Sequence, residues 1–417
     1  MNTNNVNSPK RRFRSFEGEW EQRKLGNIAS MHARIGWQNL RTSEFLDNGD
    51  YYLITGTDFL NGRINFEKCH YVNKERYQQD KKIQVGKGSI LITKDGTLGK
   101  VALVTDLNKP ATLNAGVFNV VVKVPSINET YLYQYLAAPF LMDYVSKRAT
   151  GGTIKHLNQG ILVDFPVDIP SYKEQVTIGQ FLVCLDNAVT LHQHKLDKLK
   201  NLKKAYLSEM FPTEGERVPK RRFPGFEGKW ECRKLKKLAE FRRGSFPQPY
   251  GKTEWYGGSG SMPFVQVVDV LSNLKLAETT KQQISRLAQN QSVLVPKDSV
   301  VVTLQGSIGR VAITQYDAYV DRTLLIFEKF LLPIDGYYWA LSIQKLFDIE
   351  SKKAPGGTIK TITKEALSEF EVLVPVIDEQ KKIGNFFKKL DQSITLQQQK
   401  LDKLNDLKKA YLNELFV

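Results

Sequence analysis

The side chains with chemical potential in this chain are ones that bind, because the motifs of the common catalytic sites are missing. The sequence has no HExxH zinc motif, no GxxxxGK[ST] phosphate loop and no GxSxG nucleophile turn. It also lacks the [DNS]PP[YFW] motif that holds a flipped base in amino-methyltransferases. Three cysteines, none in a CxxC pair, disfavour both a disulfide framework and a structural zinc site. The sequence therefore favours a binding protein over an enzyme.

The charge balance indicates what kind of partner is bound. The 60 Lys and Arg residues outnumber the 44 Asp and Glu residues, which gives a formal net charge of +16. So basic a chain favours a polyanionic partner, either nucleic acid or an acidic membrane surface. No run approaches the ~20 apolar residues of a membrane-spanning helix, and residues 1–14 have no signal-peptide core. We expect a cytoplasmic protein.

Two dissimilar stretches hold candidate base-reading residues. Arg and Gln side chains can form bidentate hydrogen bonds with guanine and adenine in the major groove. The candidates are Arg34, Trp37 and Arg41 in the first stretch, and Arg242, Arg243, Gln248 and Tyr250 in the second. Surface arginines are common, so each of them could equally be an ordinary exposed side chain.

The chain is a tandem duplication. Residues 9–20 (PKRRFRSFEGEW) recur 210 residues later as PKRRFPGFEGKW, with nine of twelve identical, and residues 196–211 recur 205 residues later with twelve of sixteen identical. Residues 30–60 and 240–270 barely resemble each other. Similar ends and dissimilar interiors of the two repeats indicate two copies that have the same function on different targets.

Three repeated motifs each allow more than one interpretation. The PKRR runs resemble nuclear-localisation strings, but their place at the start of each repeat favours a repeated structural or phosphate-contacting role instead, and a solvated basic loop is as plausible as phosphate contact. The turns at 95–100 and 305–310 are either glycine-permitted hairpins or loops that present charged side chains to DNA. The GGTIK turns at 151–155 and 356–360 are either anion nests or plain tight turns. The DNA-contact candidates here are Lys94, Lys100, Lys155, Gln305, Arg310 and Lys360.

Each repeat is predicted to end in one long helix. β-Branched runs at 90–93, 117–122 and 300–304 predict strands, whereas residues 174–210 and 379–416 carry an apolar 3/4 spacing. We expect the two helices to pair through this seam, although packing on their own domains is the alternative. The seam residues are Leu185, Val189, Leu196, Leu199, Leu202 and Tyr206, repeated as Leu390, Ile394, Leu401, Leu404, Leu407 and Tyr411. His192 and Gln397 occupy equivalent seam positions and could fix the register.

The expected fold class is α+β, with two mixed α/β domains in tandem pseudo-repeat and two long helices that pair as a coiled coil. The expected boundaries are an N-terminal segment (1–20), domain 1 (21–170), helix 1 (171–211), a linker (212–222), domain 2 (223–375) and helix 2 (376–417).

These motifs, in this order and twice, resemble the specificity subunit of type I restriction–modification enzymes over essentially the full chain. The carriers are FEGEW…RKLGNIA and FEGKW…RKLKKLA, the hairpins TLGKVALV and SIGRVAI, and the run from GGTIK to the Pro and Glu-Gln that open each helix. In the second copy Lys236 replaces Gly26, so that turn is expected to differ.

The resemblance implies two target-recognition domains separated by two long antiparallel helices. It implies a non-catalytic subunit in which each domain reads one half of a bipartite double-stranded DNA target. It also implies two modification subunits, which use S-adenosylmethionine, and two restriction subunits, which use ATP and Mg²⁺; no cofactor is expected in this chain. Two alternatives remain: a coiled-coil adaptor that binds DNA or an acidic protein, and a fused DNA methyltransferase or nuclease with an unrecognised site.

Overall fold

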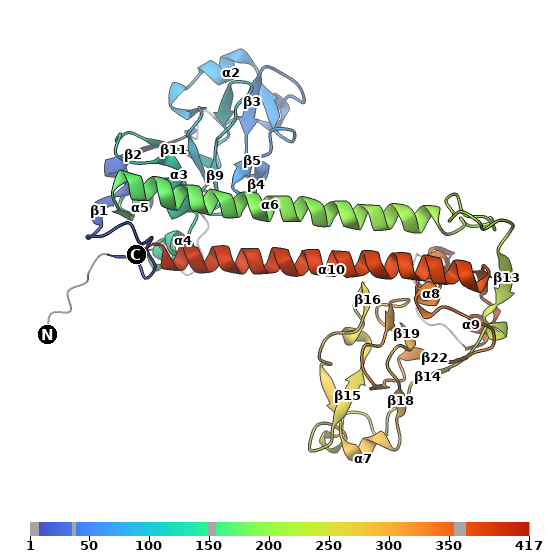
Figure 1. Cartoon of the computed structure of the whole chain (residues 1–417). Coiled ribbons are helices and arrows are strands. Elements are labelled where there is room, and N and C mark those ends of the chain that lie inside the picture. Colours follow the sequence, from blue (N-terminus) through green and yellow to red (C-terminus); the bar gives the residue numbers. More distant parts are fainter. Residues whose placement is uncertain (1–7, 36–38, 149–155, 354–363, 417) are drawn as a thin grey trace. The chain divides into compact units, whose positions relative to one another are not determined.

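The structure is a computed structural model that describes residues 8–35, 39–148, 156–353 and 364–416 (Figure 1). The chain forms two compact units. The first comprises Met1–Lys195 and Gln398–Val417, and the second comprises Leu196–Gln397. The first unit thus combines both ends of the chain.

Two sheets form the domain of the first unit. One is antiparallel and consists, in order, of β2 (Ala29–Ala33), β11 (Val117–Val122), β8 (Ile90–Thr93) and β9 (Val101–Leu103). The other consists of β6 (His70–Val72), β3 (Tyr51–Ile54), β10 (Ala111–Leu113) and β7 (Gln84–Val85), with β3 and β10 parallel. Smaller antiparallel pairs are β1 (Glu21–Lys24) with β12 (Pro166–Ile169), and β4 (Phe59–Leu60) with β5 (Arg63–Ile64).

Strand β8 is buried on both faces, which explains its unbroken apolar sequence. Ile90 and Ile92 belong to the core shared with the helices, whereas Leu91 faces the core under the second sheet. This alternation is the period of two that a strand imposes. The short helices of this unit are α1 (Leu25–Ile28), α2 (Lys74–Gln78), α3 (Glu129–Leu136), α4 (Pro139–Arg148) and α5 (Gln159–Val163).

The second unit repeats this plan. Its larger sheet consists of β14 (Ala239–Arg243), β22 (Leu324–Phe330), β19 (Val300–Thr303), β20 (Val311–Ile313) and β16 (Leu274–Lys275). Its other sheets consist of β17 (Gln282–Ile284), β15 (Met262–Val265), β21 (Ala318–Val320) and β18 (Val293–Val295), and of β13 (Glu231–Lys234) with β23 (Glu371–Val374). Its helices are α7 (Arg286–Gln289), α8 (Gly336–Lys353) and α9 (Lys364–Glu369). The strands expected at 90–93, 117–122 and 300–304 are therefore confirmed, and the mixed α/β fold class with them.

The two long helices are α6 (Tyr172–Glu209) and α10 (Ile377–Glu414), within three residues of their expected bounds (Figure 1). A glutamine in each first turn anchors the helix start. Gln175 Nε2 donates to Pro170 O (2.9 Å), and Gln175 Oε1 accepts from Asn128 N (2.9 Å) at the start of α3. Gln380 repeats both contacts with Pro375 and Asp335. No helix in the described part of the chain is both long and apolar enough to span a membrane.

Contacts within each unit show that α6 and α10 run antiparallel. In the first unit the start of α6 meets the end of α10, where Asp186 pairs with Lys408 at 2.5 Å. In the second unit the end of α6 meets the start of α10, where Lys203 pairs with Asp391 at 2.7 Å. The end of each helix also closes a core, because Phe416 packs edge-on to Tyr135 and Phe211 stacks on Tyr338.

The expected seam is only partly correct. Leu196, Leu390 and Leu401 are buried, but Leu202 and Leu407 are 40% and 43% exposed. The remaining seam residues are partly buried: Leu185, Val189, Leu199, Tyr206, Ile394, Leu404 and Tyr411. On α6 the inward stripe follows 199, 203, 206 and 210, the period of a straight helix, and Leu202 lies about 70° away from it. The helices also pack on the domains, so the alternative interpretation is correct as well: Ile178 and Leu182 join the core of the first unit, and Ile383 and Phe387 that of the second.

Candidate DNA interface

Three loops of the first unit converge where β3, β8 and β10 end. The Asn114 N–H donates to Ile54 O (2.9 Å), and the Lys94 N–H donates to Gly116 O (2.9 Å). A Cβ atom on Gly56 would lie 3.3 Å from Thr93 Cγ2, so the remaining loop also packs closely. We call residues 55–58, 94–100 and 114–116 the first loop face.

The second unit builds the same arrangement. The Asp321 N–H donates to Val265 O (3.0 Å), and the Leu304 N–H donates to Thr323 O (2.8 Å). A Cβ atom on Gly306 would lie 3.5 Å from Val267 Cγ1. Residues 266–269, 304–310 and 321–323 form the second loop face.

The shared backbone bonds align the two loop faces residue by residue. They place Gln266 where the first unit has Thr55, Asp321 where it has Asn114, and Arg322 where it has Ala115. Buried aspartates hold both first turns: Asp58 accepts from Thr55 N (2.7 Å) and Asp269 from Gln266 N (2.8 Å). The frame is therefore common while the side chains that it presents differ.

The repeated hairpins have a structural role. Gly99 and Gly309 have φ values of 73° and 82°, and a Cβ atom there would lie 2.2 Å from Met142 Sδ and 2.7 Å from Phe347 Cβ. Only glycine allows this conformation and this approach to α4 and α8. The hairpin interpretation is thus confirmed, and the charged or amide side chains Lys100, Gln305 and Arg310 remain exposed on these loops.

The prediction that Arg34 contacts a DNA base is wrong. Arg34 is 2% exposed, and its guanidinium donates to Leu113 O (2.9 Å) and to Thr112 Oγ1 (3.3 Å) inside the domain. Burial lowers the pKa of Arg34, and the buried group is satisfied by acceptors of its own unit. Arg34 therefore supports, from inside the domain, the end of β10 and the loop that follows it.

The other expected readers lie at different places. Arg41, Arg242, Arg243 and Gln248 are exposed, with Arg242 3.7 Å from Glu328. Lys94 is partly buried, with Nζ 5.6 Å from the Phe118 ring centroid. Trp37, Lys155 and Lys360 lie outside the described residues, and so do the GGTIK turns.

Tyr250 does join the second loop face. Its hydroxyl donates to Asp321 Oδ2 (2.7 Å) and accepts from Gln266 Nε2 (3.2 Å). The Arg322 guanidinium lies 5.4 Å from the Tyr250 ring centroid. Sequence reasoning missed Gln266 and Arg322; aligning the buried Asp58 and Asp269 would have exposed the difference at Gln266.

The PKRR arginines belong to the fold. Arg12 contacts Glu174, and Arg222 contacts Glu379, each through two nitrogen–oxygen distances of 2.7 Å. The preceding arginines reach the ends of the long helices, where Arg11 pairs with Glu414 and Arg221 with Glu209. The structural interpretation is therefore correct for these four arginines.

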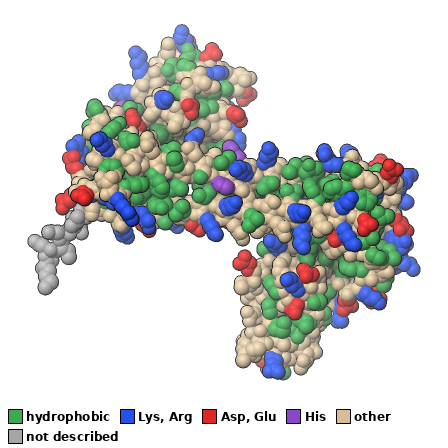
Figure 2. All heavy atoms as spheres, viewed as in Figure 1, with side chains coloured by type: hydrophobic (Ala, Val, Ile, Leu, Met, Phe, Trp, Pro, Cys, Tyr) green, Lys and Arg blue, Asp and Glu red, His purple; other side chains and the backbone are tan. Residues whose placement is uncertain are grey.

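Basic side chains are spread over the face of the molecule that Figure 2 shows. On the face that Figure 2 shows, Lys and Arg side chains occur on both units, interspersed with acidic ones. A dispersed positive charge suits contact with a phosphate backbone more than with a small anion.

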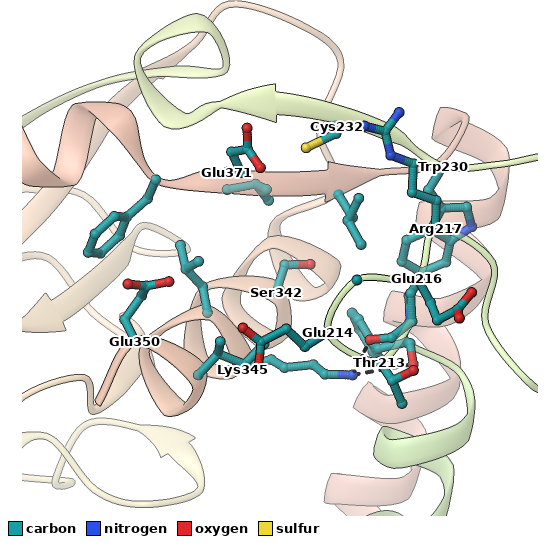
Figure 3. A pocket seen from close by; sticks show the side chains of 18 of the residues that line it. Thr213, Glu214, Glu216, Arg217, Trp230, Cys232, Ser342, Lys345, Glu350 and Glu371 are labelled. Carbon is teal, nitrogen blue, oxygen red and sulfur yellow. Dashed lines mark hydrogen bonds between the residues drawn. The ribbon is translucent and has the colours of Figure 1, made fainter. Parts of the chain in front are cut away.

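The second unit contains a cavity of about 510 Å³ between the end of α6, α8 and β23 (Figure 3). Lys345 reaches along it and donates to Pro212 O (2.9 Å) and Phe211 O (3.3 Å). Burial lowers the pKa of Lys345 to about 8. In the first unit the corresponding place, beside the end of α10, is filled by the aromatic side chains of Tyr135 and Phe140, which pack on Phe416. Lys345 thus satisfies carbonyl groups at the end of α6.

Both long helices leave leucines uncovered at equivalent positions. Leu191 and Leu396 are 52% and 58% exposed, in addition to Leu202 and Leu407. Each unit contains one leucine of each pair: Leu191 and Leu407 in the first, Leu396 and Leu202 in the second. The recurrence of exposed leucines at equivalent positions of the two helices makes them candidate residues of an interaction surface.

Comparisons with known proteins agree with the fold and the duplication. The sequence model of the type I restriction modification DNA specificity domain matches residues 17–201 and again residues 227–406. A putative type I restriction enzyme MjaX specificity subunit from Methanocaldococcus jannaschii is 23% identical over 410 residues, covering 95% of this chain and 92% of that protein. The EcoBI specificity subunit of Escherichia coli is 22% identical over 204 residues, covering 47% and 42%.

Solved structures show the same architecture. The crystal structure of the S subunit of a type I restriction–modification system from M. genitalium superposes with a TM-score of 0.64 at 15% identity, covering 98% of this chain and 99% of that one. A chain from a study of complex assembly in the type I system gives a TM-score of 0.53 at 16% identity, covering 95% and 97%. With its two specificity domains on one repeated frame, the chain belongs to the family of type I restriction–modification specificity subunits.

Proposed function

We propose that this specificity subunit reads a bipartite DNA target, one half with each loop face, and that each unit docks one modification subunit. The observation that carries the proposal is the pair of loop faces: identical backbone bonds present Thr55, Asn114 and Ala115 in one and Gln266, Asp321 and Arg322 in the other. Two different readers on one frame fit two different half-sites.

Docking is proposed to use the exposed leucines of α6 and α10. Because each unit carries one leucine of each pair, the chain offers two equivalent surfaces, which fits two modification subunits. Two restriction subunits would join through these. In this proposal S-adenosylmethionine, ATP and Mg²⁺ are used by the partner subunits, while this chain contributes only binding. The proposed assembly acts on cellular DNA and is expected in the cytoplasm.

The proposal is tested by reconstituting the full chain with its modification subunits and mapping methylated sites over a whole genome. The expected product is a motif of two short specific segments separated by an unspecified spacer, with two modification subunits per chain by native mass. The purified chain alone should transfer no methyl group from S-adenosylmethionine.

Two results would contradict the proposal. Methylation by the chain alone would support the fused-enzyme alternative. Salt-sensitive DNA binding without any preferred motif in the assembled complex would support the adaptor alternative.

A further inference from the structure

A chain of three side chains crosses the second loop face. Asp321, 1% exposed, accepts from the Tyr250 hydroxyl at 2.7 Å, and the Tyr250 oxygen accepts from Gln266 Nε2 at 3.2 Å. Thr323 holds the carboxylate from the other side through its N–H (2.9 Å) and its hydroxyl (2.5 Å).

The proton order in this chain is fixed by its buried end. A carboxylate only accepts hydrogen bonds, so the Tyr250 hydroxyl must donate to Asp321. Burial, followed by this contact, raises the pKa of Tyr250 to about 12, so the hydroxyl keeps its proton at neutral pH. Its oxygen can then only accept, which forces Gln266 to turn its NH₂ group toward Tyr250 and its Oε1 away.

The backbone of Gln266 and the ring of Tyr250 are also held in place by neighbouring groups. The Gln266 N–H donates to the buried Asp269 carboxylate (2.8 Å), which in turn accepts from Lys281 N (2.8 Å). The Tyr250 ring lies 5.0 Å from the Phe246 ring centroid and 5.4 Å from the Arg322 guanidinium. Gln266 itself is only partly buried, so its amide is both oriented and accessible.

The orientation selects a base. One amide N–H is used by Tyr250, which leaves the second N–H as a donor and Oε1 as an acceptor. Adenine presents the complement in the major groove, with N7 as acceptor and its amino group as donor. Guanine presents two acceptors there, and its O6 would face Gln266 Oε1 and repel it.

We propose that Gln266 reads an adenine in the half-site of the second unit and that Tyr250 is its positioning residue, oriented by Asp321. This inference rests on the proposed function and deepens it, because it assigns a specificity-determining residue to one loop face.

The first unit has no such arrangement among its described residues. Its equivalent residue, Thr55, donates its hydroxyl to Asp58 Oδ2 (2.9 Å) within its own turn. The equivalent of Asp321 is Asn114, whose Oδ1 accepts from the adjacent Ala115 N–H (2.8 Å). An effect confined to one half-site is therefore expected.

The experiment maps methylation by the full chain with its modification subunits, for the wild type and for Gln266→Ala, Tyr250→Phe and Gln283→Ala. Gln283 lies on β17 and accepts from Ser261 (2.7 Å), so its variant is the matched control. The half-site of the first unit serves as an internal measure of folding.

Gln266→Ala should relax one A·T position of the second half-site, with discrimination there falling roughly 5- to 150-fold, the range for one bidentate contact. Tyr250→Phe should relax the same position less, because the amide is retained but free to turn. Gln283→Ala should change neither half-site.

The inference is overturned if the wild type yields a motif that Gln266→Ala leaves unchanged, or if the relaxed position is not A·T. It is also overturned if Tyr250→Phe relaxes a different position. Failure of the proposed function is distinguishable, because the wild type would then yield no bipartite motif at all.

Discussion

Arg222 forms a bidentate ion pair with Glu379, whose carboxylate is completely buried at the start of α10. Both nitrogen–oxygen distances are 2.7 Å, and the Arg222 side chain is 15% exposed. Arg222 also donates to Gly228 O (2.6 Å). This ion pair joins the basic motif at the start of the second repeat to α10, the helix at the end of the same repeat. In the first repeat, Arg12 makes the same contact with Glu174.

Removing one partner of this pair should destabilise the second unit strongly. Arg222→Met leaves a buried carboxylate without its counter-charge, which costs about 3–5 kcal/mol. The double variant Arg222→Met with Glu379→Gln should recover part of that loss, because no buried charge remains. The measurement is denaturant unfolding of the full chain.

The neighbouring Arg221 gives a matched control. Its pair with Glu209 is largely exposed, at 57% and 36%, so Arg221→Met should leave the free energy of unfolding nearly unchanged. Equal losses for the two variants would show that the buried pair is not what holds the motif.

The exposed leucines should matter for assembly and not for folding. Leu191→Asp together with Leu396→Asp should weaken docking of modification subunits in both units, since each charge would face an apolar partner surface. The unfolding midpoint should stay unchanged, because both side chains are more than half exposed. Native mass measurement of the complex decides it, and an unaltered stoichiometry at dilute concentration would exclude these leucines.

Seam residues that pack inside a unit should behave in the opposite way. Tyr206 lies edge-on to Phe386 at 5.0 Å and adjoins the core of the second unit. Tyr206→Ala should therefore lower the free energy of unfolding, by about 3 kcal/mol or somewhat less than a fully buried aromatic residue would cost. This variant is the control for the leucine variants, because it should lower stability.

DNA binding by the assembled complex should depend steeply on salt. With about 6–10 phosphate contacts, affinity should fall about 10³- to 10⁵-fold between 50 and 200 mM salt. Lys100→Ala and Arg310→Ala, on exposed hairpin positions, should each reduce the salt slope by about 0.9, whereas Lys237→Ala, outside the loop faces, should not. A nearly flat response in titrations at several salt concentrations would contradict a phosphate-contacting surface.

Structural features were predictable from the sequence where the same motif occurs in both repeats. The long helices, the hairpins and the strand at Ile90–Thr93 were predictable because both repeats keep their glycines, prolines and apolar periods. The acid partner of Arg222 was harder, because Glu379 lies 157 residues away. A similar separation in the first repeat, 162 residues between Arg12 and Glu174, was a usable signal.

The loop faces were less predictable, because residue type does not reveal burial. Arg34 has the chemistry of a base reader but is enclosed by its own domain. Gln266 stands in an apolar run and gains its role only from Tyr250 and Asp321, 16 and 55 residues away along the chain. Such constellations depend on which loops the sheets bring together, and the divergent segments do not repeat the residues Tyr250, Gln266 and Asp321.

The central claim is that the two units read DNA independently. All three segments of the second loop face lie within residues 231–355, whereas Arg222 and Glu379 lie outside that stretch. Residues 231–355 should therefore be replaceable by those of a relative without disturbing the rest of the frame.

Methylation mapping of this exchange variant, in complex with modification subunits, is the most direct test. One half of the methylated motif should change while the other half is retained. A change in both halves would contradict it, because readout would then be shared between the repeats.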